Sequence, residues 1–151
     1  ATGTVIPELL EGLLKTPYFG RAAPKSTGPE AFHLEWLGTF LSGDESSADV
    51  QRTLLELTVE SIAHALKTSS PVTVRICGGG ANNTFLMARL SERLSPANVT
   101  TTEAVGIPPC WVEAAAFAWL AAQTLTGIPG NVPAVTGATA ERVLGGIYSG
   151  R

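Results

Sequence analysis

Three consecutive glycines near the middle of the chain constrain its fold more than any other feature. The run CGGGANN covers residues 77–83 and directly follows VTVRI (72–76), whose β-branched residues are typical of a short strand. A segment with helical periodicity follows at residues 83–94. Glycines in this place remove the side chains from the carboxyl end of a strand, which is where open α/β folds bind their ligands.

Helical patterns lie on both sides of this strand–turn–helix unit. Ser46 and Asp49 are spaced as a helix-capping pair, so Asp49 is interpreted as a helix-start carboxylate. The segment from Trp111 to Leu125 is apolar almost all round and is expected to be buried. Helices are predicted at residues 5–15, 30–41, 47–67 and 109–125 and near Glu141, with a second strand at 99–102. This alternation predicts an α/β fold with a small sheet flanked by helices.

Composition and charge exclude several classes of protein. The 151 residues are 44% hydrophobic and carry a net charge of −3 without a Lys/Arg cluster, which disfavours a nucleic-acid partner. The longest apolar run, 114–122, is too short to cross a membrane, and no signal-peptide pattern is present. Cys77 and Cys110 lie far apart without a CxxC pair, so neither a zinc site nor a disulfide framework is expected. A cytoplasmic location is the resulting expectation.

The glycine run could form the seat of a nucleotide. Asn82 or Asn83 can cap the following helix, and the free N–H groups at a helix start favour an anion. The run is neither GxGxxG nor a P-loop, because no Gly-Lys-Ser/Thr follows at the required spacing. A tight strand-to-helix turn without a ligand is an equally good interpretation of the pattern alone.

Longer segments resemble one enzyme family. CGGGANNTFLMARL (77–90) is similar to the adenosine-binding turn of anhydro-N-acetylmuramic acid kinases. Further segments are similar to that family in the same order: PYFGRAAPKSTGPEAF (17–32), DVQRTLLELTVESIAHAL (49–66), EAAAFAWLAAQTLTGIPGNVPAVTGA (113–138) and VLGGIYSG (143–150). Because these motifs cover nearly the whole chain, residues 1–151 are identified as the C-terminal, nucleotide-side part of a member of this family.

The resemblance implies a fold, an activity and a set of site residues. The fold would be a lobe of the actin/hexokinase-like (ribonuclease H-like) type. The enzyme would hydrolyse the 1,6-anhydro ring of anhydro-N-acetylmuramic acid and phosphorylate O6 with ATP and Mg²⁺, in peptidoglycan recycling and amino-sugar breakdown. Gly78, Gly79, Gly80 and Asn83 would bind the adenosine part of ATP. Glu113 would hydrogen-bond a sugar hydroxyl, although a carboxylate stabilised by a helix N-terminus is the alternative.

Parts of the family's machinery are missing from these 151 residues. The phosphate-binding GTSxDGxD loop of the N-terminal lobe and the DTGP-containing segment are absent. Phosphoryl transfer depends on positioning and on neutralising the phosphate oxygens. No catalytic residue and no metal ligand is therefore assigned here, and the fragment alone is expected to be inactive. Its partners would be ATP, the sugar and the missing lobe, with homodimer formation as an alternative way to cover the open cleft face.

Three positions differ from the family pattern. Pro29 stands where Arg is usual, His33 replaces Asn, and Cys110 replaces an acidic residue. These differences leave the sugar open, so a related kinase of the same superfamily acting on another sugar remains an alternative. A non-catalytic nucleotide-binding or assembly module is a second alternative, from a different class.

The other distinctive side chains are given structural interpretations. Cys77 is expected to be a small buried residue, and Trp36, Trp111 and Trp119 are expected in the core. Lys25 lies in the PKSTG loop, where it could contact phosphate or only support the loop.

Overall fold

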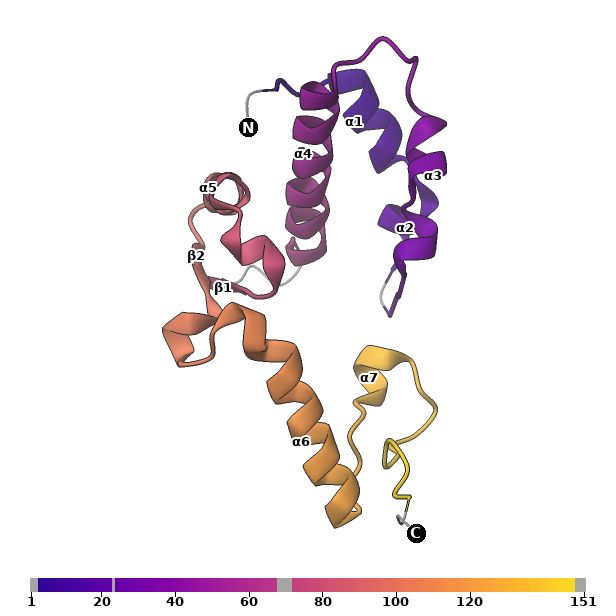
Figure 1. Ribbon diagram of the computed structural model, residues 1–151, viewed down its shortest axis with the longest axis vertical. Helices are drawn as coiled ribbons and strands as arrows, with labels where there is room; N and C mark the ends of the chain where they lie inside the picture. The colour runs from indigo at the N-terminus through magenta and orange to yellow at the C-terminus, as the bar shows by residue number, and fades with distance from the viewer. Residues whose placement is uncertain (1–2, 23, 68–71, 149–151) are drawn as a thin grey trace.

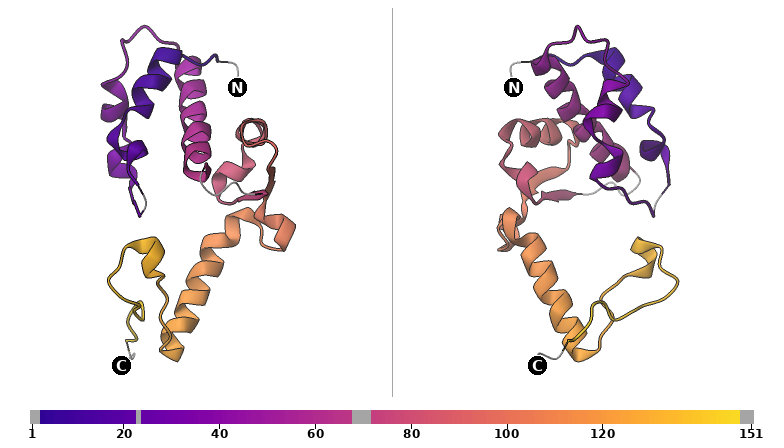
Figure 2. Two further views of the ribbon diagram at one scale, coloured as in Figure 1. Left: turned by 180° about the vertical axis from the view of Figure 1, so that it is seen from behind. Right: turned by 45° about the vertical axis from the view of Figure 1, so that its right-hand side comes forward.

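The computed structural model describes residues 3–22, 24–67 and 72–148 and arranges them in three groups (Figure 1). The helices α1 to α4 form the first group, and a small unit of two strands and α5 lies beside α4. Helix α6 leads away from these two groups, with the C-terminal segment running back alongside it (Figure 2).

The N-terminal group is built on the packing of two predicted helices. α1 (Pro7–Leu14) begins with a proline in its first turn, a position that needs no backbone N–H donor. It packs against α4 (Ser47–Leu66), and Leu9 and Leu13 of α1 meet Leu57 of α4 in a buried cluster. Both helices lie close to their predicted bounds.

The start of α4 confirms the predicted capping pair. The Oγ atom of Ser46 accepts a hydrogen bond from the N–H of Asp49 at 3.1 Å and donates one to its carboxylate at 2.8 Å. The same carboxylate accepts a bond from the N–H of Thr4 at 2.6 Å, and this bond holds the pKa of Asp49 below its usual range. Asp49 therefore starts a helix and also ties down the N-terminal segment.

The continuous helix predicted at 30–41 is wrong. The structure has a 3-10 turn, η1 (Pro29–Ala31), and a short helix, α3 (Leu34–Gly38). Between them His33 has an extended backbone, with a φ of −105° and a ψ of 175°. Its Nδ1 atom accepts a hydrogen bond from the N–H of Trp36 at 3.4 Å, so His33 acts as the N-cap of α3.

Aromatic rings connect these short elements. The rings lie in α2 (Pro17–Gly20), just after η1, in α3 and in the turn after α3, and neighbouring rings have centroids 5.0 to 5.7 Å apart. They are Tyr18, Phe19, Phe32, Trp36 and Phe40. Edge-to-face contacts of this kind stabilise side-chain packing without requiring a continuous helix.

The two predicted strands pair in parallel. β1 (Thr73–Ile76) and β2 (Asn98–Thr101) form a two-stranded sheet in which Val74 lies opposite Val99. Parallel strands need a long crossover, and α5 (Thr84–Arg93) supplies it. α5 packs on both β2 and α4. The predicted α/β class with a small sheet is therefore confirmed.

The predicted burial of the last long helix is wrong. After the 3-10 turns η3 (Thr102–Val105) and η4 (Pro109–Trp111), α6 (Val112–Thr126) runs away from the sheet. Phe117 is 72% exposed and Trp119 is 53% exposed. The physical reason is that, among the described residues, mainly the C-terminal segment lies along α6, and it covers only part of an apolar surface.

The C-terminal segment contains a short helix in a different place from the predicted one. α7 (Pro133–Thr136) ends at Gly137 in a left-handed conformation, whereas Glu141 lies outside any helix. Asn131 accounts for this, because its side chain accepts a bond from the N–H of Arg142 at 2.6 Å and donates one to the carbonyl of Ala140 at 3.0 Å. Backbone groups held by a side chain in this way are not available for a helix.

Within the described ranges, no helix combines the length and hydropathy needed to cross a bilayer.

Candidate nucleotide-binding turn

The glycine run forms a turn at the carboxyl end of β1. Gly78 has a φ of 74° and a ψ of −171°, a conformation that is essentially restricted to glycine. Its N–H donates a hydrogen bond to the carbonyl of Pro109 at 2.9 Å, which joins the turn to η4. A Cβ atom placed on Gly79 would meet no atom within 4 Å, whereas one on Gly80 would lie 3.5 Å from Leu86. The backbone at Gly79 is therefore open to a ligand.

Asn83 separates the glycine turn from α5. Residues Gly79–Asn82 form a 3-10 turn, η2, and the Oδ1 atom of Asn83 accepts a hydrogen bond from the N–H of Leu86 at 3.0 Å. Of the two asparagines considered as caps, Asn83 is the one that caps the helix. The two N–H groups of its side-chain amide take no part in this bond. Helix α5 therefore begins after the glycines, close to the predicted start at residue 83.

The second strand ends beside this turn. Because β1 and β2 are parallel, their carboxyl ends meet at the same edge of the sheet, and η3 follows β2 there. The hydroxyl oxygen of Thr102 is buried and has no hydrogen-bond partner among the described residues. This edge therefore combines an open glycine turn with a polar atom that the rest of the described chain does not satisfy.

Glu113 belongs to the same end of the sheet through its helix. It lies in the first turn of α6, four residues after Pro109, and its side chain is exposed. In the part of the chain that the structure describes, it forms no hydrogen bond with the glycine turn. The structure thus brings the element that carries Glu113 to the turn, but it does not join Glu113 to the predicted nucleotide contacts.

Several structural interpretations of single residues are corrected by the structure. Cys77 is exposed, not buried, because it follows the last residue of β1 at the open edge of a two-stranded sheet. Trp111 (65% exposed) and Trp119 are likewise outside the core, since they lie on or beside the uncovered α6. Trp36 alone among the tryptophans packs against the buried cluster of the first group.

Lys25 supports its own loop. Its Nζ atom donates to the carbonyls of Tyr18 at 3.1 Å and Phe19 at 3.2 Å. The ammonium also lies 4.8 Å from the centroid of the Tyr18 ring. These contacts favour the loop-supporting role over a phosphate contact.

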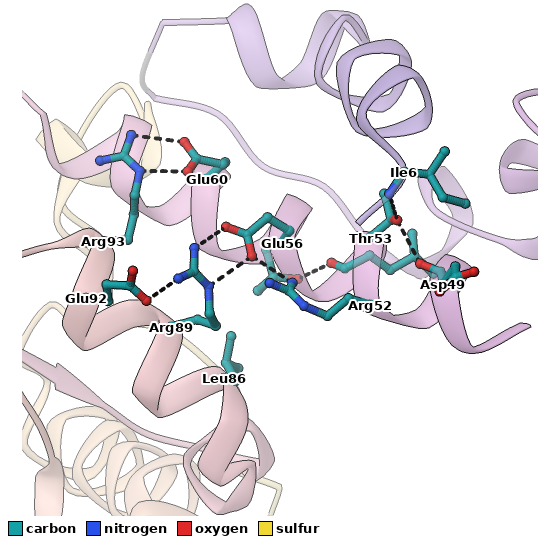
Figure 3. A network of polar contacts seen from close by, with 12 residues as sticks. Ile6, Asp49, Arg52, Thr53, Glu56, Glu60, Leu86, Arg89, Glu92 and Arg93 are labelled. Carbon is teal, nitrogen blue, oxygen red and sulfur yellow. Dashed lines mark hydrogen bonds and ion pairs between the residues drawn. The ribbon is translucent and has the colours of Figure 1, made fainter. Parts of the chain in front are cut away.

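An ion-pair network behind the turn was not anticipated from the sequence. Figure 3 shows Glu56 of α4 between Arg52, on the same helix, and Arg89 of α5. Glu56 accepts bonds from Arg52 Nη1 at 2.7 Å, Arg89 Nη2 at 2.8 Å and Arg89 Nε at 3.2 Å. Arg89 also pairs with Glu92. The spacing of Arg52 and Glu56 on one helix, and of Arg89 and Glu92 on another, could have suggested parts of this network, but not the pairing across the two helices.

The network fixes the charge of its central carboxylate. Glu56 is only 6% exposed, and burial by itself disfavours a charged carboxyl. The hydrogen bonds from Arg89 outweigh this effect, with a further contribution from Arg52, so the pKa of Glu56 lies below its ordinary value. The same contacts raise the pKa of Arg89. Glu56 is therefore ionised in the folded protein.

The family follows from comparison with known sequences. The sequence profile of anhydro-N-acetylmuramic acid kinase matches residues 1–150. The chain belongs to the anhydro-N-acetylmuramic acid kinase family. It is 52% identical over 149 residues to the anhydro-N-acetylmuramic acid kinase of Nitrosomonas europaea and 50% identical over 150 residues to that of Nitrosospira multiformis. These matches cover 97% and 98% of this chain.

The chain is shorter than these family members. It spans 41% of the length of both kinases, and the match to the kinase of Pseudomonas syringae pv. tomato, at 51% identity, covers 42% of that protein. These figures give the shared length alone. They do not support the predicted C-terminal placement.

The differences from the family pattern have different structural settings. His33 caps α3 with a ring nitrogen, a role that the side-chain oxygen of the Asn expected from the resemblance would also fill. Cys110 lies exposed in η4, next to the Pro109 carbonyl that binds the turn. Among the described residues, no three His, Cys, Asp or Glu side chains gather as a metal site would require.

Proposed function

We propose that this chain binds the adenosine part of ATP at the glycine turn, through Gly78, Gly79, Gly80 and Asn83. The observation that carries the proposal is the combination of a glycine-only conformation at Gly78 with an open backbone at Gly79. A turn that served only to join a strand and a helix would need the first feature but not the second. Membership of a kinase family supports the proposal, because kinases use ATP.

The donors for such a ligand are backbone and amide groups. The N–H groups of Gly79 and Gly80 precede the first internal hydrogen bond of η2, so they are not used by that helix. The side-chain nitrogen of Asn83, the residue at the end of η2, supplies two further donors. Mg²⁺ would accompany ATP and be held by its phosphates, as is usual for this ion.

The whole reaction is proposed from the family. The kinases that match this chain are named for anhydro-N-acetylmuramic acid. The proposed activity is hydrolysis of the 1,6-anhydro ring and phosphorylation of O6, with Glu113 hydrogen-bonding a sugar hydroxyl. The unit of β1, α5 and β2 would then be part of an actin/hexokinase-like lobe.

The proposal assigns only part of the reaction to these residues. Because the chain spans 41% of the length of the Nitrosomonas kinase and lacks the GTSxDGxD motif, we expect it to bind ATP but not to phosphorylate sugar alone. The two exposed free cysteines fit a reducing compartment, so a cytoplasmic setting is part of the proposal.

Calorimetric titration of MgATP into the chain, with a Gly79→Val variant beside it, tests the nucleotide site. The backbone at Gly79 is not in the left-handed region, and a Cβ there meets no atom within 4 Å. The variant should therefore fold, while its side chain occupies the space proposed for the ligand. We expect saturable binding by the unchanged chain and a loss of about tenfold or more in affinity for the variant.

Gly38→Val is the matched control, because Gly38 also has open space at its Cβ but lies at the end of α3. It should bind MgATP as the unchanged chain does. Equal binding by all three proteins would contradict the assignment of the site to the turn. Absence of binding by the folded, unchanged chain would contradict the proposal that these residues bind ATP by themselves.

A further inference from the structure

The carboxylate of Glu56 lies where α4 meets α5, and it touches cations from both helices (Figure 3). Both of its oxygens are used, because Arg89 contacts Oε1 and Oε2 while Arg52 contacts Oε2. A bidentate arginine–carboxylate pair fixes the relative orientation of the two groups as well as their distance. Glu56 therefore restrains how α5 lies on α4.

A second path connects Glu56 to the beginning of α5. The guanidinium of Arg52, which Glu56 holds at 2.7 Å, lies 5.0 Å from the centroid of the Phe85 ring. Phe85 is the second residue of α5, and it follows the cap residue Asn83 by two positions. Glu56 thus acts on the middle of α5 through Arg89 and on its first turn through Arg52.

A gain in stability does not by itself explain why an ion pair is buried between these two helices. The cost of removing two charges from water often equals or exceeds their attraction, whereas fixed geometry is what such a pair supplies. The geometry matters here because α5 carries Asn83 at its start, and Asn83 ends the glycine turn.

We propose that Glu56 is a positioning residue for the nucleotide site: through Arg89 and Arg52 it holds the first turn of α5, and with it Asn83 and the glycine turn, in the orientation that binds ATP. This inference rests on the proposed function. Glu56 itself touches no proposed ligand atom, so its effect is indirect.

The same two helices supply a matched comparison. The carboxylate of Glu60 on α4 accepts hydrogen bonds from Arg93 of α5, at 2.6 Å from Nε and 3.0 Å from Nη2. This pair has the same chemistry, but Arg93 is the last residue of α5, at the end far from the turn, and the pair is more exposed. A role in general helix packing would be shared by both pairs, whereas a role in positioning the turn belongs to Glu56 alone.

The test compares Glu56→Gln with Glu60→Gln in the full chain, by amide hydrogen exchange without nucleotide and by MgATP titration. We expect Glu56→Gln to speed exchange in residues 78–86 about tenfold more than in the rest of the chain and to weaken MgATP binding by a similar factor, because Arg89 and Arg52 lose their ionised acceptor. Glu60→Gln should leave both quantities near those of the unchanged chain. Equal effects of the two variants on exchange in 78–86 would overturn the inference.

Arg89→Lys and Arg93→Lys form a second pair, which decides the matter if Glu56→Gln does not fold. Both keep the positive charge and remove the two-point contact, and only Arg89→Lys should loosen the turn. The exchange measurement also separates the two proposals. An unchanged chain that fails to bind MgATP contradicts the nucleotide site, whereas the exchange difference between the paired variants still supports or overturns the positioning role.

Discussion

At Gly78 the backbone adopts a conformation that a residue with a side chain reaches only with strain. A Gly78→Ala substitution should lower the free energy of unfolding by about 2 kcal/mol, the usual cost of such backbone strain. Urea denaturation followed by circular dichroism measures this change. Gly79→Ala is the control and should change the stability little, because Gly79 lacks a positive φ and has open space at its Cβ. Similar losses of unfolding free energy in the two variants would show that the positive φ at Gly78 is not the cause of the loss.

The lowered pKa of Glu56 predicts how stability depends on pH. A carboxyl group whose pKa falls on folding stabilises the protein above its unfolded pKa of about 4.3, and this contribution disappears as the pH falls through the lower, folded value. The charged groups facing Glu56 are Arg52 and Arg89, with the Glu60–Arg93 pair and Glu92 next to them.

Glu56→Gln should therefore cost about 2 kcal/mol near neutral pH and less in acid, because Arg52 and Arg89, which are partly buried, lose their ionised acceptor, while Arg89 keeps its pair with Glu92. The measurement is the urea midpoint of both proteins from neutral pH to below the unfolded pKa. Glu45, whose pKa is lowered to about 2 mainly by the Ser42 N–H, titrates in both proteins and cancels in the difference. A difference that stays constant with pH would contradict the assignment.

At the scale of the elements, α5 depends on a buried leucine at its centre. Leu90 is 0% exposed, and α5 packs on both α4 and β2. Leu90→Ala should lower the free energy of unfolding by about 3 kcal/mol, through lost burial and the cavity left behind. Leu125→Ala on α6, where the side chain is 73% exposed, is the matched control and should cost much less. Thermal or urea unfolding of both variants gives the comparison, and equal losses would mean that α6 is covered in solution.

At the scale of the whole molecule, the uncovered face of α6 is the main feature. Phe117 and Leu125 lie eight residues apart on this helix, so they share a face, and both are more than 70% exposed. Apolar surface of this extent is rarely left in water. In the family, the part of the chain beyond these 151 residues is available to cover it, since the matched kinases are much longer.

We therefore expect this chain alone to associate with itself as its concentration rises, and a Phe117→Lys variant to shift the equilibrium toward the monomer. Sedimentation velocity over a concentration series measures both. Tyr148→Lys serves as a control, because Tyr148 is 93% exposed but lies outside α6. A strictly monomeric chain at all concentrations would contradict the expectation.

Local physics explains which features the sequence determined. The strands, α1, α4 and α5 follow from side-chain periodicity and from caps such as Ser46 and Asn83, which act within a few residues. The glycine turn was likewise predictable, because only glycine reaches the conformation found at Gly78. Motif order, together with the local pattern, was also sufficient to indicate the family.

Contacts between distant residues decided the rest. The Gly78–Pro109 bond and the Glu56–Arg89 pair join positions 31 and 33 residues apart, and no local pattern specifies such partners. The sequence shows that α6 is apolar, but burial depends on whether another layer is present to cover it, so its exposure appeared only in the tertiary structure. Periodicity and capping act along the chain, whereas burial and ion pairing depend on what the fold brings together across it.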